Sequence, residues 1–249
     1  MANAVHVISD AISRHGRVAL LYSGGLESSL LLHLAEPERA SITAYTVRTG
    51  AEFPHMVDFI DRKLVGWDHR IIRTDLAKSF REFGIPASVV PIEHNPVTAS
   101  MLNAEERSPR IVPWPACCLK NRSVPGWEAA KADGLTAVLY GQRAGDFAKP
   151  ELASCPGLEI VAPLWAVTRA EVQAAIDHLN VELPEHYSEY PSSLDCSVCP
   201  SSLTTKRRAW MAKRCPEALS VAEGLHNEVT KAAFSALDGD NTKNAFVVT

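Results

Sequence analysis

The feature that most constrains the fold is an alternation of short apolar segments with helical ones. The segment RVALLYS (17–23) has the length of a buried strand, and GLESSLLLHLAE (25–36) has the length and composition of a helix. The same succession recurs in SITAYTV (41–47) followed by FPHMVDFIDRKLVG (53–66). Strands that alternate with helices predict an α/β fold, a doubly wound and mostly parallel sheet with helices on both faces.

Six further segments extend this alternation. Strands are predicted at 69–75, 136–142 and 158–164, and helices at 3–15, 124–134 and 168–180. In the first helix Val5, Ile8 and Ile12 lie on one side, and Thr168 is an N-cap for the last. The chain is therefore expected to build most of its core from one sheet and its covering helices.

Two parts of the chain depart from the alternation. Residues 85–116 carry several prolines and no clear periodicity, which predicts a long loop. The region after Pro200 is mostly helical in pattern. We therefore predict a main α/β domain over residues 1–200 and a helical C-terminal extension over residues 201–249.

Charge and composition narrow the class of protein. The formal net charge is −4, so no global basic signal points to nucleic acid. The N-terminal stretch lacks the basic flank and apolar core of a secretion signal, and no apolar run approaches the roughly 20 residues that span a bilayer. We expect a cytoplasmic protein without membrane contact. Its six cysteines are then metal ligands or reactive thiols rather than disulfides.

The glycine junction after the first strand has the chemistry of a phosphate cradle. Gly24 and Gly25 allow close backbone approach where a strand ends and a helix begins, and amide N–H groups there favour an anion. Hydroxyl donors are added by Ser23, Ser28 and Ser29. The spacing is neither that of a Walker loop nor G-x-G-x-x-G. A tight strand–helix turn without a ligand is the alternative interpretation.

Four cysteines form a second constellation. Cys117 and Cys118 are adjacent in WPACCLKNR, and Cys196 and Cys199 form a C-x-x-C in LDCSVCP. Adjacent side chains diverge in regular structure, so two neighbouring ligands require a bent backbone. By ligand type four thiolates suit zinc and a 4Fe–4S cluster equally. Two unrelated buried cysteine pairs are the alternative.

The glycine junction resembles a known family. SGGLESS (23–29) is similar to the S-G-G-x-D-S pyrophosphate loop of the PP-loop ATP pyrophosphatases, with Glu27 where that family usually has aspartate. Those enzymes cleave ATP between the α and β phosphates and adenylate an acceptor. The resemblance implies that Ser23, Gly24, Gly25 and Ser28 bind ATP. It also implies that Glu27 binds Mg²⁺.

The cysteine pattern resembles the iron–sulfur sulfonucleotide reductases, the branch of this superfamily that acts on adenylylsulfate or phosphoadenylylsulfate. RTGAEFP (48–54), CCLKNRSVP (117–125) and GQRAGD (141–146) match segments of that branch in order. The resemblance runs from about residue 17 to residue 200, and it implies a nucleotide-binding domain with a 4Fe–4S cluster on Cys117, Cys118, Cys196 and Cys199. It further implies roles in nucleotide binding or catalysis for Thr49, Arg122, Gly141 and Arg143.

These arginines have alternative interpretations. Arg143 would contact a phosphate or ribose, or form a surface ion pair. Lys120 and Arg122 would balance the charge of the cluster and hold an anionic substrate, or remain solvated loop charges.

The chain departs from the reductases at its C-terminal end. The reductases carry a nucleophilic cysteine in an E-C-G-L-H tail, whereas AEGLHNEV (222–229) contains Glu223 and no cysteine. The last cysteine is Cys215, which is either a substitute nucleophile or a packing residue. Because the double glycine is retained, as in ATP-cleaving members, the expected function is adenylation of an acceptor with release of pyrophosphate, in support of sulfur transfer.

Two alternatives stay open. One is a sulfonucleotide reductase that uses Cys215 or an external thiol, and the other is a non-enzymatic nucleotide-binding subunit with a zinc site. The expected partners are ATP, a sulfur donor such as a cysteine desulfurase and a nucleic-acid or small-molecule acceptor. The basic stretch 204–214 would contact nucleic acid or form a solvated helix face. A homo-oligomer is compatible with the sequence.

Overall fold

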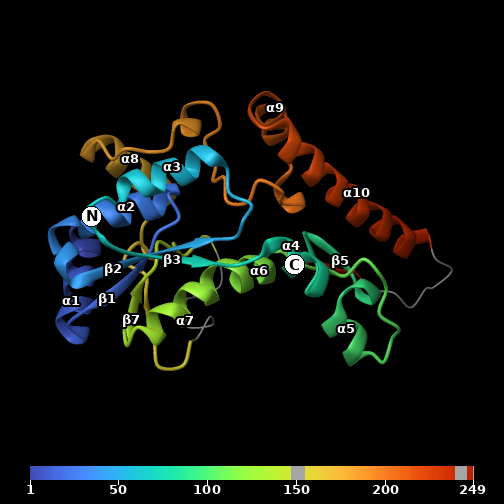
Figure 1. The fold of residues 1–249 in the computed structure, drawn as a ribbon, viewed down its shortest axis with the longest axis horizontal. Helices are drawn as coiled ribbons and strands as arrows, with labels where there is room; N and C mark the ends of the chain where they lie inside the picture. The colour runs from blue at the N-terminus through green and yellow to red at the C-terminus, as the bar shows by residue number, and fades with distance from the viewer. Residues whose placement is uncertain (147–154, 239–245, 249) are drawn as a thin grey trace. The chain divides into compact units, whose positions relative to one another are not determined.

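The computed structural model describes residues 1–146, 155–238 and 246–248 (Figure 1). The chain forms two compact units that interleave along the sequence. Unit 1 comprises Met1–Arg48, Glu52–Arg73 and Arg122–Asp195, and unit 2 comprises Thr49–Ala51, Thr74–Asn121 and Cys196–Thr249. The division of the chain at residue 200 into a domain and an extension stays a prediction, and part of that extension, 239–245 and 249, lies outside the described residues.

Unit 1 is built on a five-stranded sheet in the order β3-β2-β1-β7-β8, with every neighbouring pair parallel. The strands are β1 (Val18–Leu21), β2 (Ile42–Arg48), β3 (Asp68–Arg73), β7 (Ala137–Leu139) and β8 (Glu159–Val161). Each coincides with a segment predicted as a strand. The doubly wound α/β fold is therefore confirmed.

Helices cover both faces of this sheet. They are α1 (Ala2–His15), α2 (Leu26–Ala35), α3 (Pro54–Lys63), α7 (Val124–Ala132) and α8 (Arg169–Leu179), with the short helices η1 (Glu36–Ser41) and η5 (Glu185–Ser188). Figure 1 shows α2, α3 and α8 on one face and α7 on the other. Thr168 caps α8 as predicted, in a reciprocal capping box with Glu171.

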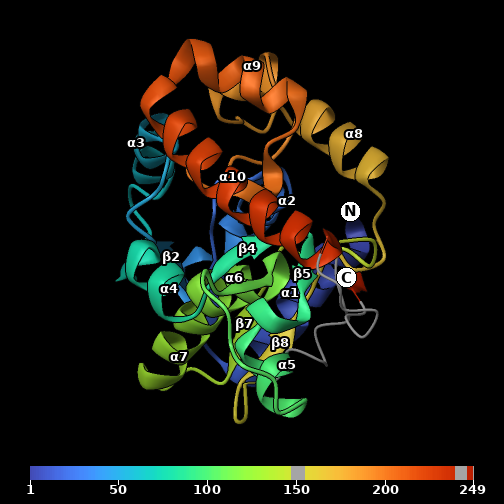
Figure 2. The same cartoon turned by 90° about the vertical axis from the view of Figure 1, so that its right-hand side faces the viewer.

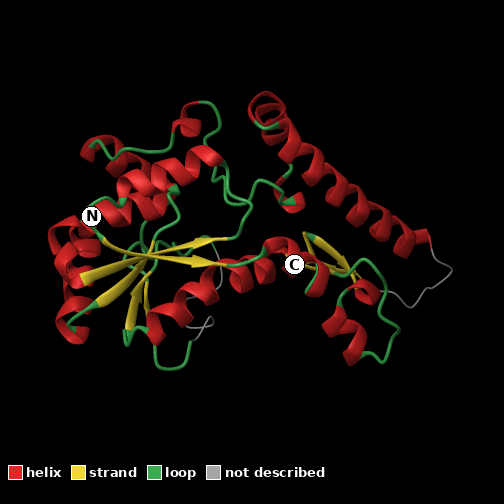
Figure 3. Ribbon diagram, in the orientation of Figure 1, coloured by secondary structure: helices red, strands yellow, loops and turns green. Residues whose placement is uncertain are grey.

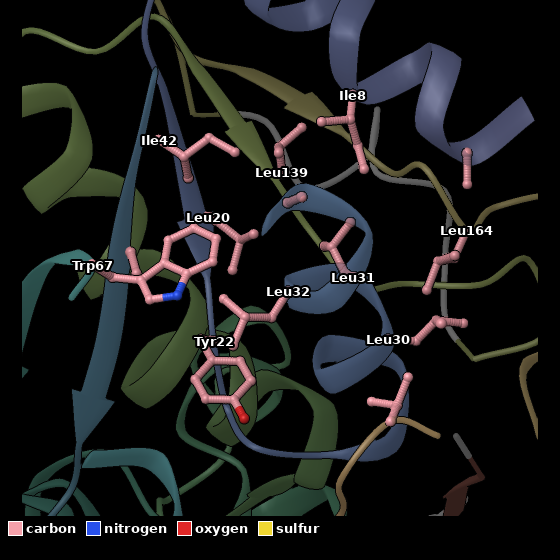
Figure 4. Packing of buried hydrophobic residues seen from close by; sticks show 14 of the residues in the cluster. Ile8, Leu20, Tyr22, Leu30, Leu31, Leu32, Ile42, Trp67, Leu139 and Leu164 are labelled. Atoms are coloured by element: carbon pink, nitrogen blue, oxygen red, sulfur yellow. The ribbon is translucent and has the colours of Figure 1, made fainter. Parts of the chain in front are cut away.

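The core of unit 1 has two layers, because successive side chains of each strand point to opposite faces of the sheet. In β1, Val18 and Leu20 pack with α2 on one face, while Ala19 and Leu21 pack with α7 on the other. Figure 4 shows Leu20 and the next residue on that face, Tyr22, beside leucines of α2. Each fully buried leucine contributes about 1.5–3 kcal/mol through burial, so this layer holds the start of α2 firmly at the end of β1.

The buried side of α1 agrees with the predicted one except at Val5. Ile8 is buried and Ile12 packs against the core, whereas Val5 is 41% exposed. Ala4 and Ala11 are buried on the same side as Ile8, and their small side chains let the helix approach the sheet closely.

Unit 2 corrects the prediction of a long loop over residues 85–116, because this stretch contains regular elements (Figure 3). They are β4 (Ile85–Ala87), β5 (Val89–Pro91), η2 (Ile92–His94), α5 (Pro96–Met101), β6 (Ile111–Pro113) and the start of α6 (Trp114–Cys118), after α4 (Leu76–Glu82). Strands of three residues are too short to show a period. Asn95, whose side chain accepts from the amides of Val97 and Thr98, and Pro96 at the first position did mark a helix start.

The C-terminal part of unit 2 is helical, in agreement with the pattern after Pro200. Its elements are η6 (Pro200–Ser202), α9 (Thr205–Arg214), α10 (Pro216–Asp238) and β9 (Phe246–Val248). β4 pairs with β6 in parallel, and β5 pairs with β9 in antiparallel. The long helix α10 contacts α9, β4 and β5 (Figure 2). Among the described residues, no helix combines the length and apolarity that crossing a bilayer requires.

Candidate functional site

The junction between β1 and α2 lies at the point where the strand order of the sheet reverses. β1 is flanked by β2 on one side and by β7 on the other, so the chain turns opposite ways from these two neighbours. In open parallel sheets, ligands bind at the carboxyl ends of the strands at this position. The predicted residues Ser23, Gly24 and Gly25 follow β1 there, and Gly141 follows β7 on the neighbouring strand.

The two glycines of the junction have different reasons to be glycine. Gly24 has φ +73°, and a Cβ on it would lie 2.9 Å from Ile60 Cγ1, so both backbone and packing require glycine. Gly25 has an extended backbone, and a Cβ there would find only ordinary contacts, 3.5–3.9 Å from three hydroxyl oxygens. These hydroxyls belong to Ser23, Ser28 and Ser193. Gly25 therefore leaves open a small space that is surrounded by hydroxyl donors.

The amides of the first turn of α2 are only partly engaged. The N–H of Leu26 donates to Tyr187 Oη at 3.0 Å, and the N–H of Gly25 makes a long contact of 3.4 Å with Ser23 Oγ. Within the described residues, the N–H groups of Glu27 and Ser28 have no hydrogen-bond partner, and α2 has no side-chain cap. Two amides and the positive end of the helix dipole are thus available to an anion.

The loop after β7 packs against this turn. A Cβ on Gly141 would lie 3.1 Å from the backbone nitrogen of Ser28, which is rigid, so glycine is required for the close approach. Two residues later, Arg143 places Nε 3.0 Å from Glu27 Oε1, and its Nη2 contacts Asp146. The structure therefore brings the predicted residues Gly141, Arg143 and Glu27 together.

The Glu27–Arg143 pair is close but poorly aligned. Only 11% of the Arg143 side chain and 20% of the Glu27 side chain are exposed. Glu27 Oε1 and Arg143 Nε are both inaccessible to solvent, yet neither makes a hydrogen bond of acceptable angle, despite their 3.0 Å separation. A misaligned pair leaves both groups with bonding capacity. Arg169 Nη1 lies 3.8 Å from the same oxygen, so two guanidinium groups approach this carboxylate, and Arg143 also pairs with Asp146.

All four predicted cysteine ligands lie in unit 2. Cys117 is buried in an apolar cluster that Cys196 partly joins. Burial raises the pKa of the Cys117 thiol to about 12, and the nearby Cys196 and Cys199 contribute to this rise. All six cysteines of the chain are thiols rather than disulfides. The thiols of Cys117, Cys196 and Cys199 are therefore neighbours.

The backbone around the adjacent cysteines is bent, as predicted. α6 ends at Cys118, and a π-helical turn (Leu119–Ser123) follows directly. Asn121 Nδ2 donates to the Cys117 carbonyl at 2.9 Å within this bend. Nevertheless, no group of three or more His, Cys, Asp or Glu side chains in the described part of the chain is placed to hold a metal ion. The donor set fits an iron–sulfur centre by type, whereas its present positions do not form a single-ion site.

Comparison with known proteins now places the chain. Residues 17–202 match the model of the phosphoadenosine phosphosulfate reductase domain. The chain belongs to this family. The match confirms the resemblance to the sulfonucleotide reductase branch of the PP-loop superfamily.

Two curated relatives match part of the chain, and one solved structure shares its fold. Over 97 residues the chain is 33% identical to sulfate adenylyltransferase subunit 2 of Akkermansia muciniphila, a match that spans 37% of this chain and 30% of that protein. A second such subunit, from Rhizobium meliloti, is 32% identical over 36% of this chain and 28% of its own length. The chain thus spans about a third of these curated relatives. Phosphoadenylyl-sulfate reductase from Candida auris, solved as a phosphate complex, shares the fold at a TM-score of 0.52 and 16% identity, over 78% of this chain and 88% of that one.

Two residues of the family segment at 48–54 have structural partners of their own. Arg48, at the position of the family's aspartate, is buried at the end of β2 with Nη2 2.5 Å from Asp61 Oδ1. Thr49 belongs to unit 2, where its hydroxyl accepts from the amide of Ala51 and its carbonyl accepts from that of Leu76. The role of Thr49 in nucleotide binding stays a prediction.

Of the two basic residues beside the adjacent cysteines, Arg122 is ion-paired and Lys120 is exposed to solvent. Arg122 Nη1 lies 2.7 Å from Asp195 Oδ1, both in unit 1, and Asp195 directly precedes Cys196. Lys120 Nζ lies 5.1 Å from the ring centroid of Phe83 in unit 2. The ion pair of Arg122 thus joins the segment after one cysteine motif to the residue before the other.

The C-terminal region of this family member contains no activated thiol among the residues that the structure describes. Cys215 caps the end of α9, and burial raises its pKa, although Arg207 opposes the shift. A raised pKa leaves less thiolate, which is the nucleophilic form. Glu223, in the segment that resembles the reductase tail, accepts from Arg208 Nη1 at 2.5 Å.

Three residues of the junction were not found from the sequence. Tyr187 accepts the Leu26 amide, Ser193 borders the space at Gly25, and Arg169 approaches Glu27. Tyr187 and Ser193 lie in the segment 180–195, which has no periodicity and no motif. Arg169 directly follows the predicted N-cap of α8. That position was the one feature of the sequence that could have identified Arg169.

Proposed function

We propose that this protein binds MgATP at the β1–α2 junction, adenylates an oxygen acceptor with release of pyrophosphate, and thereby supports sulfur transfer. Membership of the phosphoadenosine phosphosulfate reductase domain family supports nucleotide binding. The relatives named sulfate adenylyltransferase subunit 2 support an adenylyl transfer and make sulfate the first acceptor to test.

The observation that carries the proposal is the pair of unengaged amides on Glu27 and Ser28. They lie beside the hydroxyl-lined space at Gly25, at the switch point of the sheet. A triphosphate tail offers the oxyanions that such groups bind. An anion bound only at the N-terminus of the helix would not need the third hydroxyl, that of Ser193. A pyrophosphate group has enough oxygen atoms to contact both amides and all three hydroxyls.

The proposed reaction is one displacement at phosphorus. An acceptor oxygen attacks the α-phosphorus and forms a new P–O bond, the bond from that phosphorus to the α,β-bridging oxygen breaks, and pyrophosphate leaves with the electron pair. Arg143 would turn from Glu27 towards the α-phosphate, where its fork neutralises developing charge. Catalysis is then mainly orientation and charge neutralisation.

Glu27 would hold Mg²⁺. Its Oε1 is buried without a hydrogen bond, and Mg²⁺ in nucleotide sites commonly takes one or two carboxylates together with phosphate oxygens. When bound, the ion would neutralise charge on the phosphates.

The four cysteines would hold a 4Fe–4S cluster, or zinc as the alternative. If all four thiolates are ligands, no iron is left open, so the cluster would supply structure and a net negative charge rather than sulfide. Sulfur would come from a separate donor, such as a desulfurase, and would displace AMP from the adenylated acceptor. The exposed lysines of α9, Lys206 and Lys213, would contact a nucleic acid, whereas Arg207 is buried and donates to the carbonyl of Cys196.

The test is an anaerobic assay of pyrophosphate release from MgATP with sulfate and with other acceptors. The proposal expects acceptor-dependent pyrophosphate, about tenfold slower in Glu27→Gln, which removes one charge-assisted contact. Glu36→Gln is the matched control, because Glu36 follows the end of the same helix, is half-exposed and pairs with Arg39 instead. Acceptor-independent hydrolysis, or equal rates in both variants, contradicts the proposal.

A second candidate function is favoured by the family match itself. A sulfonucleotide reductase would release sulfite from adenylylsulfate or phosphoadenylylsulfate with an external thiol and without ATP. The raised pKa of Cys215 disfavours that residue as the nucleophile. Labelled sulfite formed in the absence of ATP, and unaffected by Cys215→Ser, would favour this candidate over adenylation.

A further inference from the structure

An open groove lies beside the junction, within unit 1. It has a volume of about 530 Å³ and is lined by Arg169, Ala170 and Gln173 of α8 together with Leu183, Tyr187 and Pro191. This volume is in the range of pockets that hold small organic ligands. Most of its lining surface is apolar, and its polar groups are few.

Tyr187 connects the groove to the junction. Its hydroxyl oxygen accepts the N–H of Leu26 at 3.0 Å, so the lone pair is used and the hydroxyl hydrogen points elsewhere. Among the described residues that hydrogen has no acceptor. Burial raises the pKa of Tyr187 to about 12, so the group stays protonated and remains a donor at neutral pH.

The ring of Tyr187 is fixed in position by a neighbouring histidine. His186 stacks on it with ring centroids 4.4 Å apart, and His186 is itself buried. The Nδ1 of His186 lies 3.2 Å from His55 Nε2, and its Nε2 donates to the carbonyl of Ser192 at 3.2 Å. A ring fixed in this way directs its hydroxyl with little loss of side-chain entropy when a ligand binds.

Arg169 supplies positive charge at the same end of the groove. Its Nη2 donates to the carbonyl of Pro191 at 3.1 Å, and its Nη1 lies 3.8 Å from Glu27 Oε1. A guanidinium has five N–H donors, so most of them remain for a ligand. The charged group is therefore anchored between the groove and the residue that would hold Mg²⁺.

We propose that this groove binds the acceptor substrate, and that the acceptor is a small organic acid. Its oxyanion would be held by the Tyr187 hydroxyl and Arg169, and its apolar body would pack on Leu183 and Pro191. Inorganic sulfate is much smaller than this groove, so its binding would leave most of the apolar lining exposed to water. The inference rests on the proposed adenylation, because it assigns the substrate class for that reaction.

The step balances without a further reactant. One oxygen of the carboxylate attacks the α-phosphorus of ATP, the α,β-bridging P–O bond breaks, and the products are an acyl adenylate and pyrophosphate. The acid would lie with its charged end towards the first turn of α2, where the phosphates bind. The Tyr187 hydroxyl would hold the second carboxylate oxygen and so leave the attacking one directed at phosphorus.

The test uses 4-fluorobenzoate as probe, with ¹⁹F NMR titration against the full-length protein, and inorganic sulfate as the second arm. The inference expects 4-fluorobenzoate to bind at least tenfold more tightly than sulfate. Arg169→Gln and Tyr187→Phe should each weaken that binding by about tenfold, because each removes a hydrogen bond to a charged group. Arg169→Gln alters a half-exposed side chain and keeps the test valid if Tyr187→Phe does not fold.

Matched controls are available in the same unit. Arg39 is 55% exposed, as Arg169 is 53% exposed, but pairs with Glu36. Tyr45 is buried and donates to Asp133 at 2.6 Å. Arg39→Gln and Tyr45→Phe should leave probe binding unchanged. The inference is overturned if 4-fluorobenzoate does not bind, if sulfate binds as tightly, or if the controls weaken binding as much as the groove variants do.

MgATP binding, measured in parallel, distinguishes failure of the groove assignment from failure of the adenylation proposal. If MgATP binds and the probe does not, the groove assignment fails and the adenylation proposal stands. If the probe binds in the groove and MgATP does not, the adenylation proposal fails, and with it the assignment of the bound acid as its acceptor. A tenfold loss of MgATP affinity in Tyr187→Phe, with probe binding intact, would assign the hydroxyl to the nucleotide and overturn the groove proposal.

Discussion

The β1–α2 junction of unit 1 and the cysteine segment of unit 2 both carry polar groups that the chain itself leaves incompletely used, but they are built differently. At the junction, a parallel sheet and two buried layers fix the backbone, so the amides of Glu27 and Ser28 are in place before any ligand binds. Around Cys117 the chain consists of three-residue strands, short helices and a π-turn. Preorganisation therefore belongs to the first region.

The second region would depend on the group that it is proposed to bind. Three thiols are neighbours, yet among the described residues they do not form an ion-binding group, and burial keeps the Cys117 thiol protonated because it raises the pKa. A thiol must lose its proton to become a ligand, so assembly of a cluster would couple to local rearrangement of unit 2. Under the proposal, the first region is ready for its ligand and the second would be completed by its own.

The largest expected effect is loss of iron from unit 2, with MgATP binding in unit 1 retained. Cys196→Ser should abolish nearly all bound iron, because a 4Fe–4S cluster normally requires four cysteine thiolates. MgATP affinity should change little, because no residue of the junction is altered. Iron analysis and the visible spectrum after anaerobic purification measure the first effect, and Cys155→Ser is the control, since Cys155 lies outside both motifs. Full iron retention in Cys196→Ser would refute the cluster assignment.

The second prediction concerns the close packing of the loop after β7 against α2 in unit 1. Gly141→Ala places a Cβ 3.1 Å from the Ser28 nitrogen, and backbone cannot give way cheaply there. We expect a loss of about 1–3 kcal/mol in the free energy of unfolding, together with weakened MgATP binding. Gly145→Ala is the control, because nothing lies within 4 Å of the position that its methyl group would take. Denaturant unfolding measures both variants, and equal midpoints would show that the loop after β7 does not press on α2.

The third prediction separates the metal from the nucleotide. Glu27→Gln should lower the affinity for MgATP about tenfold but that for metal-free ATP much less, because the carboxylate is proposed to act through Mg²⁺. Titration calorimetry with and without Mg²⁺ gives both values. An equal loss under the two conditions would assign Glu27 to holding Arg143 rather than to the ion.

The last prediction concerns the stability of unit 1 at alkaline pH. Burial raises the pKa of Tyr22, Tyr45 and Tyr187, and all three lie in unit 1. A raised pKa means that the folded state holds its proton longer, so this contribution is complete below pH 10 and is lost as the pH rises through about 10 to 12. We expect stability to fall over that window by about 2 kcal/mol for Tyr187, and by less in Tyr187→Phe. A flat unfolding profile from about pH 9 to 11.5 would contradict this.

The sequence predicted unit 1 far better than unit 2 for a physical reason. Long periodic segments such as 25–36 are specified by burial of one side, so their type and order followed from pattern. In unit 2, strands such as β4 and β6 are held by pairing with each other across the sequence, and three residues carry no period.

The candidate site was likewise predicted in part. Glu27 and Arg143 were found because they lie in motifs, and the structure brings them together. Tyr187 and Ser193 were missed because their approach to the start of α2 depends on how an irregular segment folds, which no local pattern encodes. Cysteine spacing identified a thiol cluster but not its geometry.

The central claim is that the first-turn amides of α2 bind a phosphate tail, and ¹⁵N NMR of the full chain titrated with MgATP tests it most directly. The account predicts the largest amide shifts at Glu27 and Ser28, saturating together, with a smaller shift at Leu26 because Tyr187 already accepts its N–H. Saturable MgATP binding that leaves the amides of Glu27 and Ser28 unmoved would contradict it.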